Sequence, residues 1–229
     1  MRHIGFLWLC LILGGLLHAQ DAYHQGLQSE LQADFGLSGG TWVFSSTEAA
    51  NLSDATRYGG SYSTQSTSGL PFGTKARMFI NAARPQTYNA GWFLQNPNSI
   101  QRDDVILIVF YLRSVGTVGR VNFFAEDAST FDKEIFYNMP VDTGWQRYFI
   151  PIQISKNYSA QGLSVGFHLG HQAQTIEIGG FTALNFGNSY PLEAFPSEVN
   201  NRFYDGWEPD APWRNEAATR IENLRKANL

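Results

Sequence analysis

Cysteine is almost absent from this chain. The one cysteine, Cys10, lies inside an apolar run from Ile4 to Leu17 that follows the basic residue Arg2 and ends in small and polar residues near Ala19. This order predicts a secretory signal peptide over residues 1–20, cut near Ala19. The mature chain then has no cysteine, which excludes a disulfide framework, so a domain of about 200 residues must be stabilised by its core alone. We expect a secreted or periplasmic protein.

Charged residues are also scarce, at 16% of the chain. Arg2 is the only basic residue of the leader, so 15 of the 16 basic residues remain against 20 acidic ones, a formal net charge of −5. The sequence has no cluster of Lys and Arg, which argues against nucleic acid and anionic membranes as partners. The apolar run is also shorter than the roughly 20 residues that a membrane anchor needs.

Recognisable catalytic motifs are missing as well. The sequence contains no nucleophile elbow, no glycine-rich phosphate loop and no paired-histidine metal motif. A glycosidase needs two carboxylates beside the scissile bond. Glu126 and Glu177 are candidates, although exposed carboxylates on strand faces are the simpler interpretation. His168 and His171 lack metal-ligand spacing, and a structural calcium ion, common in jelly-roll modules, has no sequence-local site. We predict no catalytic residue, no cofactor and no assignable metal.

Short runs rich in β-branched and aromatic residues occupy most of the chain after Phe35. Glycine, proline and asparagine separate these runs, as they do where strands reverse. The spacing predicts an all-β fold, an antiparallel β-sandwich of the jelly-roll type, over residues 21–188. The predicted strands are residues 41–44, 76–81, 92–95, 105–113, 120–126, 145–152, 163–169 and 175–184.

The C-terminal part has a different pattern. Residues 189–209 contain several prolines and predict an ordered linker that crosses a surface. Residues 210–229 predict a short amphipathic helix, because Asp210 can cap it, Pro212 suits its first turn, and Ile221 and Leu224 belong to an apolar stripe. The stripe packs either against a following domain that is missing or back on the sandwich, and the pattern fits both.

Alternation along three predicted strands separates inward from outward side chains, because neighbouring residues of a strand point to opposite faces. In each strand one set is uniformly apolar and predicts the core. These sets are Ile106, Ile108, Phe110 and Leu112 in the first strand, Val121, Phe123 and Ala125 in the second, and Val165, Phe167 and Leu169 in the third. The outward residues are then Tyr111, Arg113, Asn122, Phe124, Glu126 and His168.

If the three strands are neighbours in one sheet, these outward residues form a sugar-binding face. Pyranose rings pack their C–H faces on aromatic rings, and their hydroxyls bond to side chains such as Arg, Glu and Asn. Trp92 or Gln95 would join this face, but their parity is opposite, so a regular strand cannot present both. His171, Gln172 and Gln174 follow in a loop and are candidates for its rim, although ordinary hydration of a turn is the simpler interpretation of each. The alternative is that loops or the N-terminal segment cover the face.

Two stretches resemble a known family. Residues 168–187, from His168-Leu169-Gly170-His171 to Leu184-Asn185-Phe186-Gly187, resemble the closing strands of the carbohydrate-binding jelly-roll module upstream of some family 10 glycoside hydrolases, mainly endoxylanases. The tail, from Asp210-Ala211-Pro212-Trp213-Arg214 to Arg225-Lys226-Ala227, resembles the helical junction to the later domains of those enzymes. Together with residues 102–113, the similarity covers most of residues 24–229.

The resemblance implies a non-catalytic module that binds β-linked xylan or glucan and targets a covalently linked hydrolase. It implies binding residues at Phe124, Glu126, His168, Trp92, Tyr111 and Arg113. The catalytic barrel of the family is absent from these 229 residues, so hydrolysis is not assigned to this chain. The alternatives are a structural spacer without a ligand and a fragment of a xylan-hydrolysing enzyme.

Overall fold

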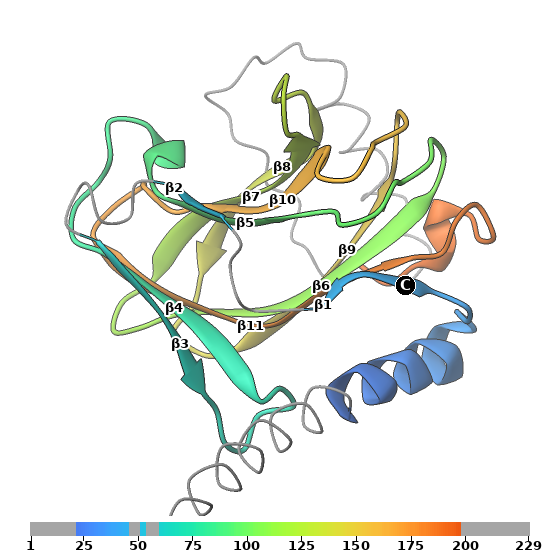
Figure 1. The fold of residues 1–229 in the computed structure, drawn as a ribbon. Helices are drawn as coiled ribbons and strands as arrows, with labels where there is room; N and C mark the ends of the chain where they lie inside the picture. Colours follow the sequence, from blue (N-terminus) through green and yellow to red (C-terminus); the bar gives the residue numbers. More distant parts are fainter. Residues whose placement is uncertain (1–21, 46–50, 54–59, 198–229) are drawn as a thin grey trace, which may run out of the picture.

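The computed structural model describes residues 22–45, 51–53 and 60–197. Within these residues two antiparallel sheets pack face to face, and residues 22–35 form a helix (Figure 1). The prediction of an antiparallel β-sandwich is therefore confirmed. The chain crosses from one sheet to the other at most connections after β4, as in a jelly roll.

Each sheet collects strands from distant parts of the sequence. Sheet A has the order β3-β4-β11-β6-β9, and β1 pairs with β11. Its strands are β1 (Thr41–Ser45), β3 (Ser61–Ser66), β4 (Thr74–Ile80), β6 (Val105–Ser114), β9 (Gln146–Gln153) and β11 (Gln174–Asn185). Sheet B has the order β2-β5-β10-β7-β8. Its strands are β2 (Asn51–Ser53), β5 (Gly91–Gln95), β7 (Gly119–Asp127), β8 (Lys133–Val141) and β10 (Leu163–His168). Two short 3₁₀ helices are η1 (Thr87–Asn89) and η2 (Leu192–Ala194).

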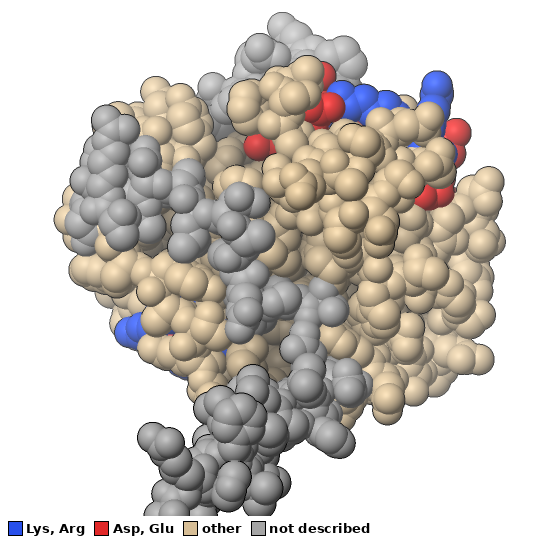
Figure 2. All heavy atoms as spheres, in the orientation of Figure 1, with Lys and Arg blue, Asp and Glu red and all other residues tan. Residues whose placement is uncertain are grey.

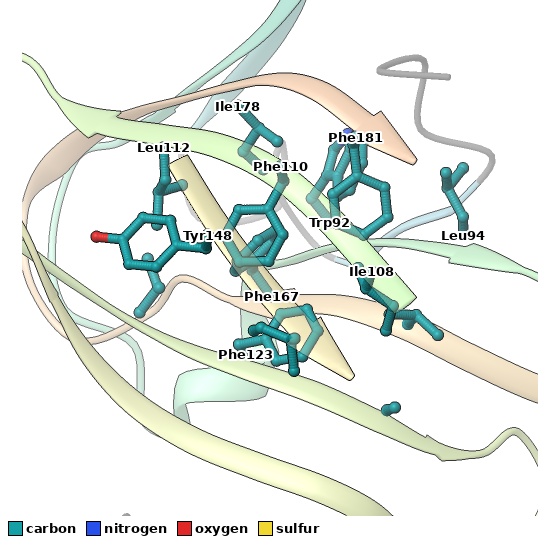
Figure 3. Close-up of a cluster of buried hydrophobic side chains, with 14 of the residues drawn as sticks. Trp92, Leu94, Ile108, Phe110, Leu112, Phe123, Tyr148, Phe167, Ile178 and Phe181 are labelled. Carbon is teal, nitrogen blue, oxygen red and sulfur yellow. The ribbon is translucent and has the colours of Figure 1, made fainter. Parts of the chain in front are cut away.

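The main core lies between the sheets and is built from aromatic rings (Figure 3). Phe110 of β6 is central, with ring centroids 5.3 Å from Phe123, 5.0 Å from Phe167 and 5.7 Å from Phe181. All the inward residues predicted for β6, β7 and β10 belong to this core. Strand parity therefore identified the inner faces correctly.

A second core covers part of the outer face of sheet A. Leu27 and Leu31 of the helix over residues 22–35 pack with Val105, Leu107 and Val109 of β6. Residues of the predicted linker also contribute to this cluster, through Leu192 and Phe195. Sheet A is thus buried on both faces along this part of β6, which explains why that strand is a continuous apolar run.

Eight predicted strands are present, and β2, β3 and β8 were missed. The residues of β3 are Ser61 to Ser66, which carry little apolar signal. The strand β8 alternates correctly, but it contains Pro140, which normally argues against a strand. Pro140 is tolerated because β8 is the edge strand of sheet B and this residue is exposed.

The predicted signal peptide and the predicted C-terminal helix lie outside the described residues. In the described part of the chain, no helix is long and apolar enough to cross a membrane. The surface seen in Figure 2 is mostly uncharged, and most of its visible acidic and basic side chains lie together toward the upper right.

Candidate functional site: a pocket on the outer face of sheet B

The three strands that were expected to share one face belong to different sheets. β7 and β10 are neighbours in sheet B, whereas β6 lies in sheet A. Tyr111 and Arg113 therefore point from the opposite side of the sandwich, away from Phe124 and His168. The expectation of a single face was wrong for these two residues, because parity assigns a side chain to a face but does not say which sheet the strand joins.

Trp92 is also excluded from the outer face. It is 0% exposed and belongs to the main core, where its ring lies 4.8 Å from that of Phe181 (Figure 3). The outward residues of β5 are Gly91, Phe93 and Gln95, by alternation with the buried Trp92 and Leu94. The prediction of Trp92 on the ligand-binding face was therefore wrong, and Phe93 lies on the outer face instead.

An aromatic row crosses the outer face of sheet B. Phe93 of β5 pairs with Gly166 of β10, Gly166 pairs with Phe124 of β7, and Phe124 pairs with Phe136 of β8. Four strands at about 4.8 Å spacing make this row roughly 14 Å wide. Gly166 leaves a gap in the row, because a Cβ atom there would lie 2.1 Å from the carbonyl oxygen of Trp92. The ring centroids of Phe93 and Phe124 lie 6.2 Å apart across it, with the ring planes tilted by 54°.

On one side of this aromatic row, polar side chains form hydrogen bonds with one another. The Oδ1 atom of Asn122 accepts hydrogen bonds from Asn138 Nδ2 at 2.8 Å and from His171 Nε2 at 2.9 Å, and its Nδ2 donates to Thr87 Oγ1 at 3.1 Å. Asn122 is 0% exposed. Its predicted role as a ligand contact is therefore contradicted, and we interpret it as the residue that fixes η1 above the sheet.

The loop residues considered for the rim form hydrogen bonds within the fold. His171 is bonded to Asn122, while Gln172 donates to the carbonyl of Val118 at 3.0 Å. Gln174 is buried and donates to the carbonyls of Arg120 and Leu169. These bonds fasten the loop between β10 and β11 to the start of β7.

On the other side of the aromatic row lies a buried ion pair. Lys133 of β8 donates to Glu126 of β7, and their side chains are 4% and 9% exposed. The ammonium of Lys133 also lies 5.8 Å from the ring centroid of Phe124 and 5.7 Å from that of Phe136. Burial disfavours the charged ammonium and lowers the pKa of Lys133 to about 8. Glu126, which was predicted as a site residue, thus has a partner that sequence reasoning missed.

His168 stands beside Phe124 in the floor of the site. Their ring centroids are 4.4 Å apart, and the ring of Tyr88 in η1 lies 6.1 Å from His168. Nδ1 of His168 is buried and has no hydrogen-bond partner among the described residues. Burial, helped by the nearby charge of Lys133 and by His171, lowers the pKa of His168 to about 3. The imidazole is therefore neutral at physiological pH.

These side chains enclose a cavity of about 480 Å³. It is lined by Tyr88, Gly91, Phe93, Phe124, Glu126, Phe131, Lys133 and His168. This size falls in the usual range of about 300–1,000 Å³ for small-molecule sites, which are mostly apolar with a few placed polar groups. Phe124 and His168 were expected to be uncovered, but they are only 2% and 7% exposed. They form the floor of a pocket, and the expected open platform was wrong.

Two exposed aromatic residues form the rim. Tyr88 is 47% exposed and Phe131 is 62% exposed. Phe131 has a φ angle of +63°, a left-handed conformation that is unfavourable for a bulky L-residue. Strained residues of this kind gather at functional sites.

The loop that carries Phe131 is fixed by Asp127. Its Oδ1 atom accepts from the backbone N–H of Ser129 at 2.8 Å and of Thr130 at 2.9 Å, and its Oδ2 atom lies 2.7 Å from Lys156 Nζ. The hydrogen bonds from Lys156 and Ser129 hold the pKa of Asp127 well below its usual range. The strained conformation of Phe131 is thus built into the loop by its neighbours.

The two carboxylates considered for glycosidase chemistry do not form a pair. Glu126 lies on the outer face of sheet B and Glu177 on the outer face of sheet A, with the sandwich between them. Among the described residues, no group of three or more His, Cys, Asp or Glu side chains is placed to hold a metal ion. The pocket therefore offers aromatic surface, one ion pair and one neutral imidazole.

Comparison with known proteins gives structural likeness only. No family model and no curated protein matches the chain. Among solved structures, a CBM4 structure covers 58% of this chain and 84% of its own, at 15% identity and a TM-score of 0.47. The CBM22-1 xylan-binding domain of Xyn10C from Paenibacillus barcinonensis covers 66% and 97%, at 12% identity and a TM-score of 0.47.

A third similar structure contains a catalytic domain. The CBM22-1–GH10 modules of the N-terminal endo-1,4-β-D-xylanase 10B from Clostridium thermocellum, complexed with xylohexaose, match over 64% of this chain but only 29% of that one, at 10% identity and a TM-score of 0.47. At these identities and TM-scores the likenesses assign the chain to no family. The fold class rests on the two antiparallel sheets themselves.

Proposed function

We propose that this chain is a non-catalytic carbohydrate-binding module that holds sugar residues of a β-linked polysaccharide in the pocket on the outer face of sheet B. The observation that carries the proposal is the combination of four aromatic rings, from Tyr88, Phe93, Phe124 and Phe131, around one cavity with polar groups at its wall. Aromatic rings supply flat apolar surface for the C–H faces of pyranoses. They do so without the clustered cations that a phosphate ligand requires.

The polar groups in the wall suit hydroxyl groups. The carboxylate of Glu126 can accept hydrogen bonds, the ammonium of Lys133 can donate them, and Nδ1 of His168 is a buried polar atom that no described residue bonds. A buried polar atom left unpaired costs free energy, which a ligand hydroxyl would recover. The polar groups of the pocket thus complement the hydroxyl groups of a neutral polyol.

We further propose β-linked xylan or glucan as the ligand and targeting of a family 10 glycoside hydrolase as the biological role. The support is the sequence resemblance of residues 168–187 and 210–227 to such modules. This assignment is more specific than the chemistry of the pocket supports, because the same groups suit neutral sugars in general.

Affinity electrophoresis tests the proposal. The mature chain is run in native gels that contain xylan without uronic acid side groups, mixed-linkage glucan or hydroxyethyl cellulose. We expect retardation by at least one of them and its loss in the double variant Tyr88→Ala/Phe131→Ala, because both rings are exposed and their removal leaves the fold intact. Phe79→Ala is the matched control, since Phe79 is 45% exposed on sheet A. Equal mobility in all gels, or retardation that survives the double variant, would contradict the proposal.

A structural spacer without a ligand is the second candidate function. The observation that favours it is the near-complete burial of Phe124 and His168. A spacer predicts no retardation by any polysaccharide, so the same gels separate the two functions.

A further inference from the structure

A cluster of basic side chains occupies the outer face of sheet A, on the opposite side of the sandwich from the pocket. One cross-strand row runs from Ser63 of β3 through Arg77 of β4 and Glu177 of β11 to Arg113 of β6. Lys75 lies two residues before Arg77 on the same face. The row is thus built from four neighbouring strands and does not depend on a loop.

Glu177 is the centre of this cluster. Its side chain is 0% exposed, and its oxygens lie 2.7 Å from Lys75 Nζ, 2.6 Å from Arg77 Nη1 and 2.6 Å from Arg113 Nη2. Burial alone would raise the pKa of Glu177, but hydrogen bonds from Lys75, Arg113 and Arg77 outweigh it and lower the pKa. One anion therefore faces three cations, and the four side chains carry a net charge of +2.

The two guanidinium groups keep donors for another anion. Each has five N–H donors, and among the described residues all the side-chain hydrogen bonds and ion pairs of Arg77 and Arg113 go to Glu177. Their side chains are 35% and 31% exposed, so solvent reaches them. Glu177 fixes both groups from below, which reduces the entropy lost when a ligand binds.

An aromatic ring stands beside these donors. Trp145 directly precedes β9, and the guanidinium carbon of Arg113 lies 4.9 Å from its ring centroid. Trp145 also contacts the buried ring of Phe72, 5.3 Å away, and remains partly exposed. Forked donors next to a fixed ring match a ligand that has both a carboxylate and an apolar ring face.

We propose that this face is a second ligand site, which binds the carboxylate of a uronic acid residue in an acidic polysaccharide. The carboxylate bridges Arg77 and Arg113, and the sugar ring packs on Trp145. The inference does not depend on the pocket of sheet B, because no residue is shared between the two sites.

Titration by nuclear magnetic resonance tests this site, with the indole N–H signal of Trp145 as the probe, assigned by its loss in Trp145→Phe. The mature chain is titrated with sodium glucuronate, with glucose and with sodium acetate. We expect a saturable shift with glucuronate, no shift with glucose, and weaker binding of acetate, which has no ring. No saturable shift with glucuronate, an equal response to glucose, or equal affinity for acetate would overturn the proposal.

Variants separate this site from general electrostatics. Arg77→Gln should weaken glucuronate binding about tenfold or more, as expected for the loss of charge-assisted hydrogen bonds. Arg102→Gln is the matched control, because the Arg102 side chain is 71% exposed elsewhere on the surface. If Arg77→Gln unfolds, Arg77→Lys takes its place in the experiment. This variant keeps the charge but loses the paired N–H donors of the guanidinium, and it should bind glucuronate measurably more weakly than the wild type. Unchanged affinity in the folded Arg77 variant would refute the assignment.

Discussion

The buried ion pair of the pocket gives the sharpest test of the structure. Glu126 and Lys133 are 9% and 4% exposed at their side chains, and the aromatic rings of Phe124 and Phe136 surround the ammonium. Lys133→Met removes the cation and leaves the carboxylate buried among apolar groups. Breaking a buried pair in this way costs about 3–5 kcal/mol. For a domain of this size, that lowers the melting temperature by roughly 10 °C.

The double variant Glu126→Gln/Lys133→Met removes both charges and nearly preserves the volume. Replacement of a buried ion pair by neutral groups of similar size is often close to neutral in stability, so we expect it to lie within about 2 kcal/mol of the wild type. Urea unfolding, followed by tryptophan fluorescence, measures both free energies. The double variant should nevertheless lose polysaccharide retardation, because the pair supplies the charged hydrogen-bonding groups of the pocket.

Two outcomes would refute this reasoning. A single variant as stable as the wild type would mean that Glu126 is hydrated or protonated at no cost, and hence not buried in the pocket. A double variant as unstable as the single one would mean that the loss came from packing and not from the unpaired carboxylate.

Three further predictions follow from the same region. Phe131→Gly should raise the free energy of unfolding by about 1 kcal/mol, because glycine adopts a φ angle of +63° without strain. The same variant should bind sugar more weakly, and a destabilised variant would contradict the reasoning. His168 and His171 should each lower stability by about 2 kcal/mol between pH 7 and 5, because unfolded histidine takes up a proton below about 6.5 whereas these two, with pKa values of about 3 and 4, do not; His168→Gln should remove about half of this loss, and an unchanged slope would argue against it. Gly166→Ala should unfold the chain or greatly lower its melting temperature, whereas Gly144→Ala, with no atom within 4 Å of its Cβ, should have no effect.

The sequence predicted which side chains point into the core, because alternation reports directly on burial. It could not predict which strands share a sheet, because that depends on pairings between residues far apart in the chain, such as Leu107 with Leu184. One signal did exist. In β6 the outward positions Val105, Leu107 and Val109 are apolar as well, and a run that is apolar on both faces predicts a strand covered on both sides.

Other site residues left weaker signals. Lys133 and Phe136 lie on β8, which alternates clearly once Pro140 is accepted at an edge strand. Tyr88 and Phe131 lie in η1 and a loop, where no periodicity reports on orientation. The helix over residues 22–35 was also missed, although Tyr23, Leu27 and Leu31 recur every fourth residue. Its stripe covers part of the outer face of sheet A, beside β6.

The most direct test of the central claim is the imidazole signal of His168 during titration with oligosaccharides of β-1,4-linked xylose or glucose. We predict a saturable shift of this signal with at least one of them. The His24 signal should not move, because its ring packs 4.5 Å from Trp42, away from sheet B. A static His168 signal with every oligosaccharide, or an equal shift of His24, would contradict sugar binding in the pocket.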